Sequence, residues 1–379
     1  MIQEQEYEIQ KLNLLAFPRN FQPLCELTGN HATVQLVTQH CTLYYSSNEL
    51  AEQAWFGIIN KIAHLIAPLM LPAPIVGTHE ERIRRTNNVT LSKRSLIEFC
   101  MSESAKLLST KKYKLAIPAT TQALKYSKDV DGENAVSVVD PYLHLAEAFL
   151  GLNQISQAEE YLSFARWIVL NSAGVLDRTA SKLYQLLGRI NFARASYESA
   201  KRDFAQSVFF SSRASGAEAI PTSLAYFCLG EVFLTQGSIE HALAFFDKVV
   251  DIWYKYLSGL HTQREQEKNM SILNNVGTRN DAAPLLEEYI AEGRTQLEKV
   301  LDCRRRLLGP GHIATGEAEY TLGLLEYFLI NNENTAEGLV LAAQRCYESQ
   351  LGNAHPSTMH VNSVLDMIQQ TIHVKSGTM

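Results

Sequence analysis

The sequence predicts an all-α fold, a superhelix of about six stacked helix pairs closed by a C-terminal capping helix. The first observation behind this prediction is a pattern that returns every 42 residues, as at Tyr142, Tyr184 and Tyr226. The second is that apolar residues inside each copy follow the i, i+3, i+4, i+7 order of one helix face. The third is glycine on the same period, at Gly132, Gly174 and Gly216. Because glycine suits the left-handed residue that ends many helices, we expect the second helix of each pair to end there.

Large and small residues alternate within each copy, as two helices in close contact require. Tyr142 and Phe149 are large residues of the first helix, whereas Ala146 and, on the second helix, Ala158 are small. The same small positions in the next two copies are Gly188, Ala200, Gly230 and Ala242. Since protein interiors are close-packed, large side chains must face small ones. The pattern therefore predicts paired helices. The tryptophans late on second helices, Trp167 and Trp253, are expected to pack in the core or between repeats.

This order of residues resembles the tetratricopeptide repeat, in which an aromatic residue, Leu-Gly/Ala and a second aromatic residue precede Ala-x3-Phe/Leu-x2-Ala. The usual length of that repeat is about 34 residues. The longer period here resembles the variety found in kinesin light chains. The two Leu-Gly-x-x-His segments, Leu308–His312 and Leu351–His355, are similar to the ends of those repeats. The resemblance implies a concave surface lined by the first helices, which suits a peptide or a helix of another protein.

Composition limits the class of protein. The chain has 379 residues, 46% of them hydrophobic, and a net charge of −6, which is typical of a globular protein of one or two domains. This charge does not favour nucleic acid as a partner. We also expect no membrane span and no secretory signal, since no apolar run reaches roughly 18 residues and the N-terminus is polar and acidic. The six cysteines are expected to be reduced thiols of a cytosolic protein.

Four segments are expected along the chain. Residues 1–23 form an N-terminal arm, in which 1–17 are a short helix or a loose segment. Residues 24–69 form a small unit outside the repeat, with a helix from Asn48 to Leu69. Residues 70–94 are a linker. Residues 95–373 are the repeat domain, whose first helix begins at Ser95, with Glu98 completing a capping box.

The period is lost after Val249. We expect a less regular helix within 259–280, a loop over 277–283 and a strong second helix from Leu285 to Leu308. A sixth pair follows. The helix from Ser357 to about Ile372 then caps the open apolar face of the stack.

The small unit resembles a MYND-type zinc finger that has lost its metal. Tyr44-Tyr45-Ser46, followed by Trp55 and Lys61, has the spacing of the end of that finger. Cys25 and Cys41 fit two ligand positions and are the residual metal candidates. The other ligand positions fall on Thr28, Thr38, Ser46, Leu50, Ile59 and Ala63, and the histidines considered as substitutes are His31, His40 and His64. Because a structural zinc needs four ligands, we expect no metal and hydrophobic packing around Trp55.

Motifs of catalysis are missing from the sequence. It contains no G-x-S-x-G, H-E-x-x-H or Walker segment, so we expect neither an enzyme nor a cofactor. Binding is the expected activity, and residues between the core positions of the first helices are the candidates for a protein-binding groove. They are His144, Glu147, Gln185, Arg189, Glu231 and Glu319.

A MYND-like N-terminus followed by tetratricopeptide repeats resembles the MYND-domain proteins of cilia and sperm flagella. The resemblance is carried by Tyr44–Lys61, Leu96–Cys100, Leu145–Ala148, Gly151–Leu162 and Trp253–Leu257. It implies a non-enzymatic adaptor of the axoneme, in the cytoskeleton of a cilium or flagellum. The implied partners are a single-headed inner-arm dynein heavy chain, a second tetratricopeptide-repeat protein and other axonemal proteins, on the doublet microtubule, without nucleic acid or membrane.

Two other functions stay open. A cargo adaptor like a kinesin light chain would need an N-terminal coiled coil, and residues 1–94 show no heptads. A cytoplasmic dynein-assembly factor or co-chaperone would need a clamp of Lys, Arg and Asn on first helices. Only Arg189 and Asn191 offer such groups there.

Overall fold

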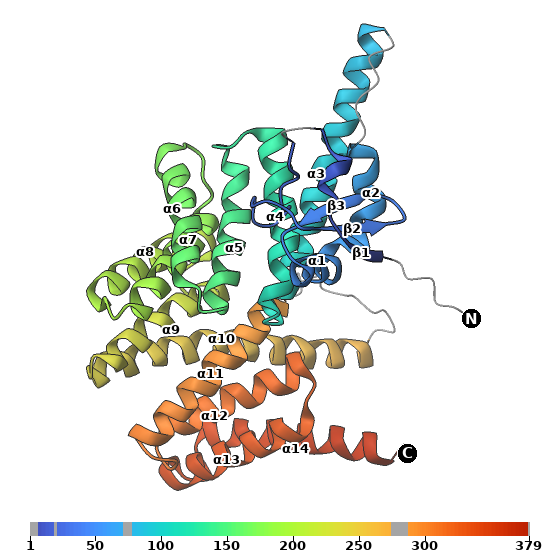
Figure 1. The fold of residues 1–379 in the computed structure, drawn as a ribbon. Coiled ribbons are helices and arrows are strands. Elements are labelled where there is room, and N and C mark those ends of the chain that lie inside the picture. The colour runs from blue at the N-terminus through green and yellow to red at the C-terminus, as the bar shows by residue number, and fades with distance from the viewer. Residues whose placement is uncertain (1–6, 19–20, 71–77, 274–286, 378–379) are drawn as a thin grey trace. The chain divides into compact units, whose positions relative to one another are not determined.

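The structure is a computed structural model that describes residues 7–18, 21–70, 78–273 and 287–377. It is predominantly helical, with a small sheet near the N-terminus, as Figure 1 shows. The chain divides into two compact units, Met1–Ile190 and Asn191–Met379. Each unit is described separately. No helix in the described ranges combines the length and the apolar character needed to cross a membrane.

The first unit begins with a three-stranded antiparallel sheet in the order β1-β2-β3. The strands are β1 (Tyr7–Lys11), β2 (Val34–Thr38) and β3 (Thr42–Tyr45). Ile9 pairs with Leu36, and Leu36 pairs with Leu43. The helix or loose arm expected over 1–17 is therefore wrong for β1. A short isolated helix is marginal in water, whereas a strand beside β2 obtains backbone hydrogen bonds along its length.

The helix expected from Asn48 to Leu69 is confirmed. It consists of α1 (Asn48–Ala54), a π-helical turn (Trp55–Ile59) and α2 (Asn60–Met70). The Ser47 side chain caps it by accepting the Leu50 N–H. Trp55 stacks on Tyr7 at a centroid distance of 4.6 Å.

This small unit shares one core with the first repeat helices. The core contains Trp55, Ile58 and Ile62 from the N-terminal helix together with Cys100 of α3 and Ala119 of α4. Gly57 permits the close approach, because a Cβ there would lie 2.7 Å from the Leu115 carbonyl oxygen. Hydrophobic packing thus joins the sheet and helix to the repeats.

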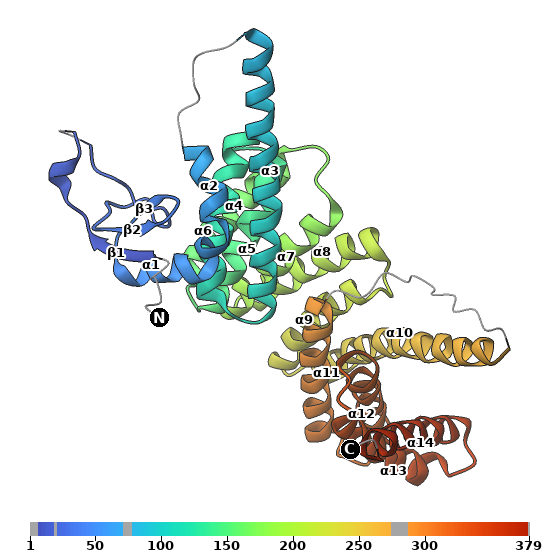
Figure 2. The same ribbon diagram turned by 90° about the vertical axis from the view of Figure 1, so that its right-hand side faces the viewer.

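Helix α3 (His79–Ser109) begins earlier than the sequence suggested. Thr78 and Glu81 form a complete capping box, and Ser95 lies inside the helix. Residues 79–94, expected as linker, are therefore helical. The first half of α3 projects beyond its neighbours in Figures 1 and 2, and its first buried residue is Leu96. Without a core partner, this half shows no apolar periodicity from which a helix could be predicted.

The remaining helices of the first unit follow the predicted pairs. They are α4 (Tyr113–Asp131), α5 (Val139–Gly151), α6 (Ile155–Asn171) and α7 (Asp177–Ala193), which reaches the boundary between the units. Ala146 and Ala158, the predicted small positions of the α5–α6 pair, are both fully buried.

The second unit continues the helix pairs. Its helices are α8 (Tyr197–Ser215), α9 (Ile220–Thr235), α10 (Ile239–Leu273), α11 (Glu287–Leu307), α12 (Ile313–Leu325) with a π-helical turn (Glu326–Ile330), α13 (Glu333–Leu351) and α14 (Pro356–Gly377). The separate helix expected after Gly259 is instead a continuation of α10. The loop expected over 277–283 lies outside the described residues. The all-α repeat fold and the final helix are confirmed.

Equivalent aromatic contacts recur in both units. In the first, the Tyr161 ring lies 6.1 Å from Tyr142 and 5.5 Å from Phe149. Two periods later, the corresponding residues are Tyr226, Phe233 and Phe245. The Phe245 ring lies 6.4 Å from Tyr226 and 5.5 Å from Phe233. Aromatic contact therefore holds the two helices of these pairs together.

The α7–α8 pair, which lies between these two pairs in the sequence, has a hydrogen bond where they have an aromatic contact. Asn191 and Asp203 stand where the other copies have Phe149 and Tyr161, and the Asn191 amide donates to the Asp203 carboxylate at 2.6 Å. The helix-pair contact thus tolerates a charge-assisted hydrogen bond in place of a ring pair.

Two glycines give a direct test of this packing. A Cβ at Gly293 of α11 would lie 2.0 Å from the fully buried Trp253 ring, whereas Gly338 of α13 has open space around it. We expect Gly293→Ala to lower the free energy of unfolding by about 1–3 kcal/mol through overpacking. Gly338→Ala should raise it by up to about 1 kcal/mol, because alanine favours helix. Urea unfolding of both variants measures this. Equal effects of the two variants would contradict the packing argument.

Candidate protein-binding surfaces

Two of the predicted groove residues, Glu147 and Arg189, meet in one charged network in the first unit, together with Lys182. Glu147 of α5 accepts Lys182 of α7 at 3.1 Å and lies 3.9 Å from Arg189. Only 14% of the Glu147 side chain is exposed. Burial by itself would raise the pKa of Glu147, but the positive charges of Lys182 and Arg189, with a smaller contribution from His144, outweigh it and lower the pKa. The network joins the first helices of two consecutive repeats.

His144 and Gln185 lie within the helix packing. The Ser104 hydroxyl lies 3.1 Å from Nδ1 of His144 and 2.6 Å from the Thr120 hydroxyl. Ser104 and Thr120 are fully buried, and burial is the main cause that lowers the pKa of His144, so the ring is neutral at pH 7. Gln185 is 6% exposed. These two side chains offer little surface to a partner.

The two predicted residues of the second unit also have cationic partners. Glu231 accepts Lys299 at 2.9 Å, and Glu319 accepts two N–H groups of Arg305 at 3.1 and 2.6 Å. Glu319 is 3% exposed. Both cations come from α11, which the pattern on the first helices did not reveal. A binding role for Glu147, Arg189 and Glu231 stays a prediction.

The residual metal candidates lie in the N-terminal unit. Thr38, at a ligand position of the resemblance, closes the β2–β3 turn, since its hydroxyl donates to the Cys41 carbonyl at 2.8 Å and accepts the Cys41 N–H at 2.9 Å. Cys25 is buried, and burial would raise the pKa of its thiol, but hydrogen bonds with Thr28 and Ser46 lower it. Within the described ranges, no three His, Cys, Asp or Glu side chains are grouped to hold a metal ion.

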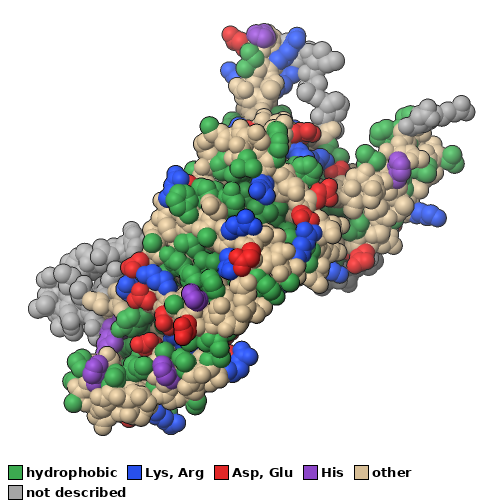
Figure 3. Space-filling model, turned by 90° about the vertical axis from the view of Figure 1, so that its left-hand side faces the viewer, with side chains coloured by type: hydrophobic (Ala, Val, Ile, Leu, Met, Phe, Trp, Pro, Cys, Tyr) green, Lys and Arg blue, Asp and Glu red, His purple; other side chains and the backbone are tan. Residues whose placement is uncertain are grey.

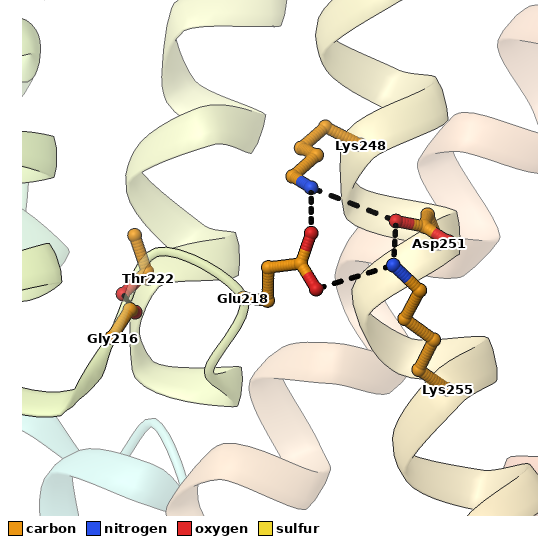
Figure 4. Close-up of polar contacts among 6 residues, drawn as sticks. All are labelled: Gly216, Glu218, Thr222, Lys248, Asp251 and Lys255. Atoms are coloured by element: carbon orange, nitrogen blue, oxygen red, sulfur yellow. Dashed lines mark hydrogen bonds and ion pairs between the residues drawn. The ribbon is translucent and has the colours of Figure 1, made fainter.

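An exposed ion-pair cluster anchors the loop between α8 and α9. Glu218 of this loop accepts Lys248 at 2.7 Å and Lys255 at 3.2 Å, and Asp251 lies between the two lysines on α10 (Figure 4). The hydrogen bonds from Lys248 and Lys255 lower the pKa of Glu218. Because solvent screens exposed pairs, the cluster orients the loop more than it stabilises the fold.

An apolar surface on α6 was missed by the sequence interpretation. Phe164, Trp167 and Leu170 are 49%, 55% and 64% exposed, so the expectation that Trp167 packs in the core is wrong, whereas Trp253 is fully buried as expected. The opposite face of α6 carries the buried Leu162. We call Phe164, Trp167 and Leu170 the α6 apolar face. Figure 3 shows hydrophobic side chains gathered at the surface on that side of the molecule.

The equivalent position in the next copy is also aromatic and exposed. Phe209 stands 42 residues after Trp167 and is 52% exposed. The Arg213 guanidinium lies 5.5 Å from the centre of its ring. The recurrence at one repeat position was the signal in the sequence that could have identified a surface role.

Comparison with known proteins finds one distant relative by sequence and several solved structures of low similarity. No family model matches it. It is 23% identical over 244 residues to a clustered mitochondria protein homolog of Aspergillus clavatus, a match that covers 62% of this chain. The chain spans only 18% of the length of that relative.

Similar solved structures share little sequence with the chain. One is a Podosopora anserina protein assigned to kinesin light chains, with nearly identical TPR-like repeats, at 12% identity and a TM-score of 0.34 over 68% of this chain and 94% of that one. Another is a Rap protein complexed with Competence and Sporulation Factor, at 16% identity and a TM-score of 0.34 over 74% and 73%. The repeat assignment rests on the helix pairs of this chain itself.

The Glu147 network predicts a pH-dependent contribution to stability. We expect Glu147→Gln to lower the free energy of unfolding by about 1–3 kcal/mol at pH 7, because Lys182 and Arg189 lose their carboxylate. The pKa of Glu147 in the folded state lies below its ordinary value of 4.5, so this stabilisation is present above pH 4.5 and is lost as pH falls through the folded-state pKa.

Chemical denaturation at pH 7 and at low pH measures the difference. The exposed Glu160→Gln on α6 is the matched control and should change stability little at either pH. A difference between wild type and Glu147→Gln that stays constant with pH would contradict the assignment.

Proposed function

We propose that the protein is a non-enzymatic adaptor of the axoneme in cilia or flagella. In this proposal it binds a single-headed inner-arm dynein heavy chain and a second tetratricopeptide-repeat protein, and helps to anchor the dynein on the doublet microtubule. It acts in the cytoskeleton and without a cofactor.

The observation that carries the protein-binding part is the α6 apolar face. Three large apolar side chains, Phe164, Trp167 and Leu170, are about half or more exposed within two turns of one helix. Grouped exposed apolar residues mark protein-interaction sites, and tryptophan is enriched where binding energy concentrates. Placed on a rigid helix whose other face is in the core, they form a preorganised docking surface.

The axonemal part of the proposal rests on the sequence resemblance. Independently of that resemblance, the N-terminal sheet and helix share a core with α3 and α4. The N-terminal unit and the first repeats therefore act as one body, and a partner bound to either is held by both.

Fractionation of axonemes from the source cell tests the proposal. We expect the protein to stay with the detergent-resistant axoneme and to elute in high salt together with an inner-arm dynein heavy chain. Complete loss into the detergent-soluble fraction would exclude the axonemal adaptor and favour the assembly factor or the cargo adaptor.

Variants of the α6 apolar face test the surface itself. We expect the double variant Trp167→Gln and Leu170→Gln to weaken retention in axonemes by about tenfold or more, because apolar contact area is lost. Its thermal stability should change little, since both side chains are exposed. Leu91→Gln is the control, because Leu91 is a similarly exposed apolar residue, 62% exposed, on α3. Equal retention of the double variant and the control would exclude this face as the docking surface.

A further inference from the structure

A cavity of about 700 Å³ opens within the second unit between α10, α12, the end of α13 and the start of α14. Its wall contains three tyrosines and three acidic residues, and no lysine or arginine is among its lining residues. The residues that matter here are Asp247, Asp251 and Tyr254 of α10, Glu317 and Tyr320 of α12, and Tyr347 of α13. A cavity of this volume has room for a short segment of peptide rather than a single ion.

Two of the three acidic residues already have partners. Asp247 is bound by the buried guanidinium of Arg304, which also donates to the Ala314 carbonyl. Asp251 lies 3.6 Å from Lys248 and 3.0 Å from Lys255. The positive charges near the cavity are therefore occupied by these carboxylates.

The third carboxylate is different. Glu317 has no ion pair, and its carboxylate has no hydrogen bond, among the residues that the structure describes. Glu317 is an exposed residue of α12, and partial burial of its carboxyl group still raises its pKa, which the charge of Arg304 only partly offsets. The ionised carboxylate thus has water but no ion-pair partner among the described residues, and it is accessible to a cationic group of a ligand.

The aromatic wall contains a second unused group. Tyr320 is 3% exposed, and its hydroxyl is buried without a hydrogen-bond partner in the described part of the chain. Its ring lies 6.2 Å from Tyr254 and 6.5 Å from Tyr347. Buried polar groups in proteins are nearly always paired, so an unpaired hydroxyl beside a cavity marks a position that a ligand can complete.

We infer that this cavity binds an arginine side chain of a segment of a partner protein. A guanidinium group can donate two parallel hydrogen bonds to the Glu317 carboxylate and stack on a tyrosine face. One further N–H can be accepted by the Tyr320 hydroxyl. The inference deepens the proposed protein-binding function and rests on it, although the cavity and the α6 apolar face belong to different units.

Other ligand classes agree less well with the lining. An anion would meet three carboxylates and no lysine or arginine, and the other titratable side chains of the lining besides the tyrosines are His355 and His360. For a divalent metal, the described residues hold no group of three ligating side chains. An arginine-containing segment can pair with the Glu317 carboxylate, stack on the tyrosine rings and fill the cavity.

Peptide binding to the full-length protein tests the inference. The probe is a fluorescent mixture of seven-residue peptides with a central arginine and random flanking residues. Its matched control is the same mixture with citrulline, which keeps the shape of arginine and removes the charge. We expect the arginine mixture to bind about tenfold more tightly than the citrulline mixture. Equal binding of the two mixtures, or binding of neither, would overturn the inference.

Variants identify the group responsible. We expect Glu317→Gln to remove the preference for arginine, while Glu240→Gln, an exposed residue near the start of α10 outside the cavity, keeps it. Glu317→Gln should not lower the melting temperature at pH 7. Glu317 is exposed and has no ion pair to lose, and its raised pKa shows that folding does not favour its ionised form, so removal of the charge should cost the fold little. An unchanged preference in Glu317→Gln would overturn the assignment.

The peptide-binding test and the axoneme fractionation can fail independently of each other. If the wild-type protein prefers arginine but leaves axonemes with detergent, the axonemal role fails and the cavity assignment stands. If it stays in axonemes and binds the two mixtures equally, the cavity assignment fails alone.

Discussion

Small residues that let two helices approach each other are the constraint on which the repeat depends. A Cβ at Gly230 would lie 2.5 Å from the Phe246 ring, and one at Gly323 would lie 2.7 Å from a Val340 methyl group. The large residue on the second helix therefore occupies the space that the small residue on the first leaves open. Since cores tolerate neither voids nor overlap, this pairing sets the distance between the two helices. The small and the large residue must therefore recur at the same positions of each repeat.

The features that could be predicted are those decided within one helix pair. The burial of Ala146 and Ala158 follows from contacts between residues close in the sequence. The features that were missed depend on distant partners or on none. β1 exists because β2 lies beside it, and the first half of α3 is stabilised by the capping box at Thr78 rather than by an apolar face. Apolar periodicity arises from a buried helix face, so it cannot predict a helix segment that buries no face.

The polar candidates show a second limit of sequence interpretation. Position on a first helix correctly selected charged side chains, but not their partners. Glu147 is paired by Lys182 of the next first helix, and Glu231 by Lys299 from α11. A helical pattern shows on which face of its helix a charged residue lies. Its counter-charge comes from another helix, which only the folded structure brings close. For the same reason the pattern predicts packing of Trp167 in the core or between repeats, although its side chain is 55% exposed.

The distribution of satisfied charges also indicates where recognition can occur. Breaking a largely buried ion pair such as Glu147–Lys182 leaves one charge without a counter-charge. A binding partner that separates the pair must therefore supply a new counter-charge before it gains any affinity. Side chains without an ion pair or hydrogen bond inside the protein can bind a partner without this energetic cost. In the first unit these are the exposed side chains of the α6 apolar face, which gain by leaving water. In the second they are the exposed Glu317 carboxylate, which gains an ion pair, and the buried Tyr320 hydroxyl, which gains a first hydrogen-bond partner. Binding energy should therefore concentrate at these groups rather than at paired carboxylates such as Glu147, which position the repeats.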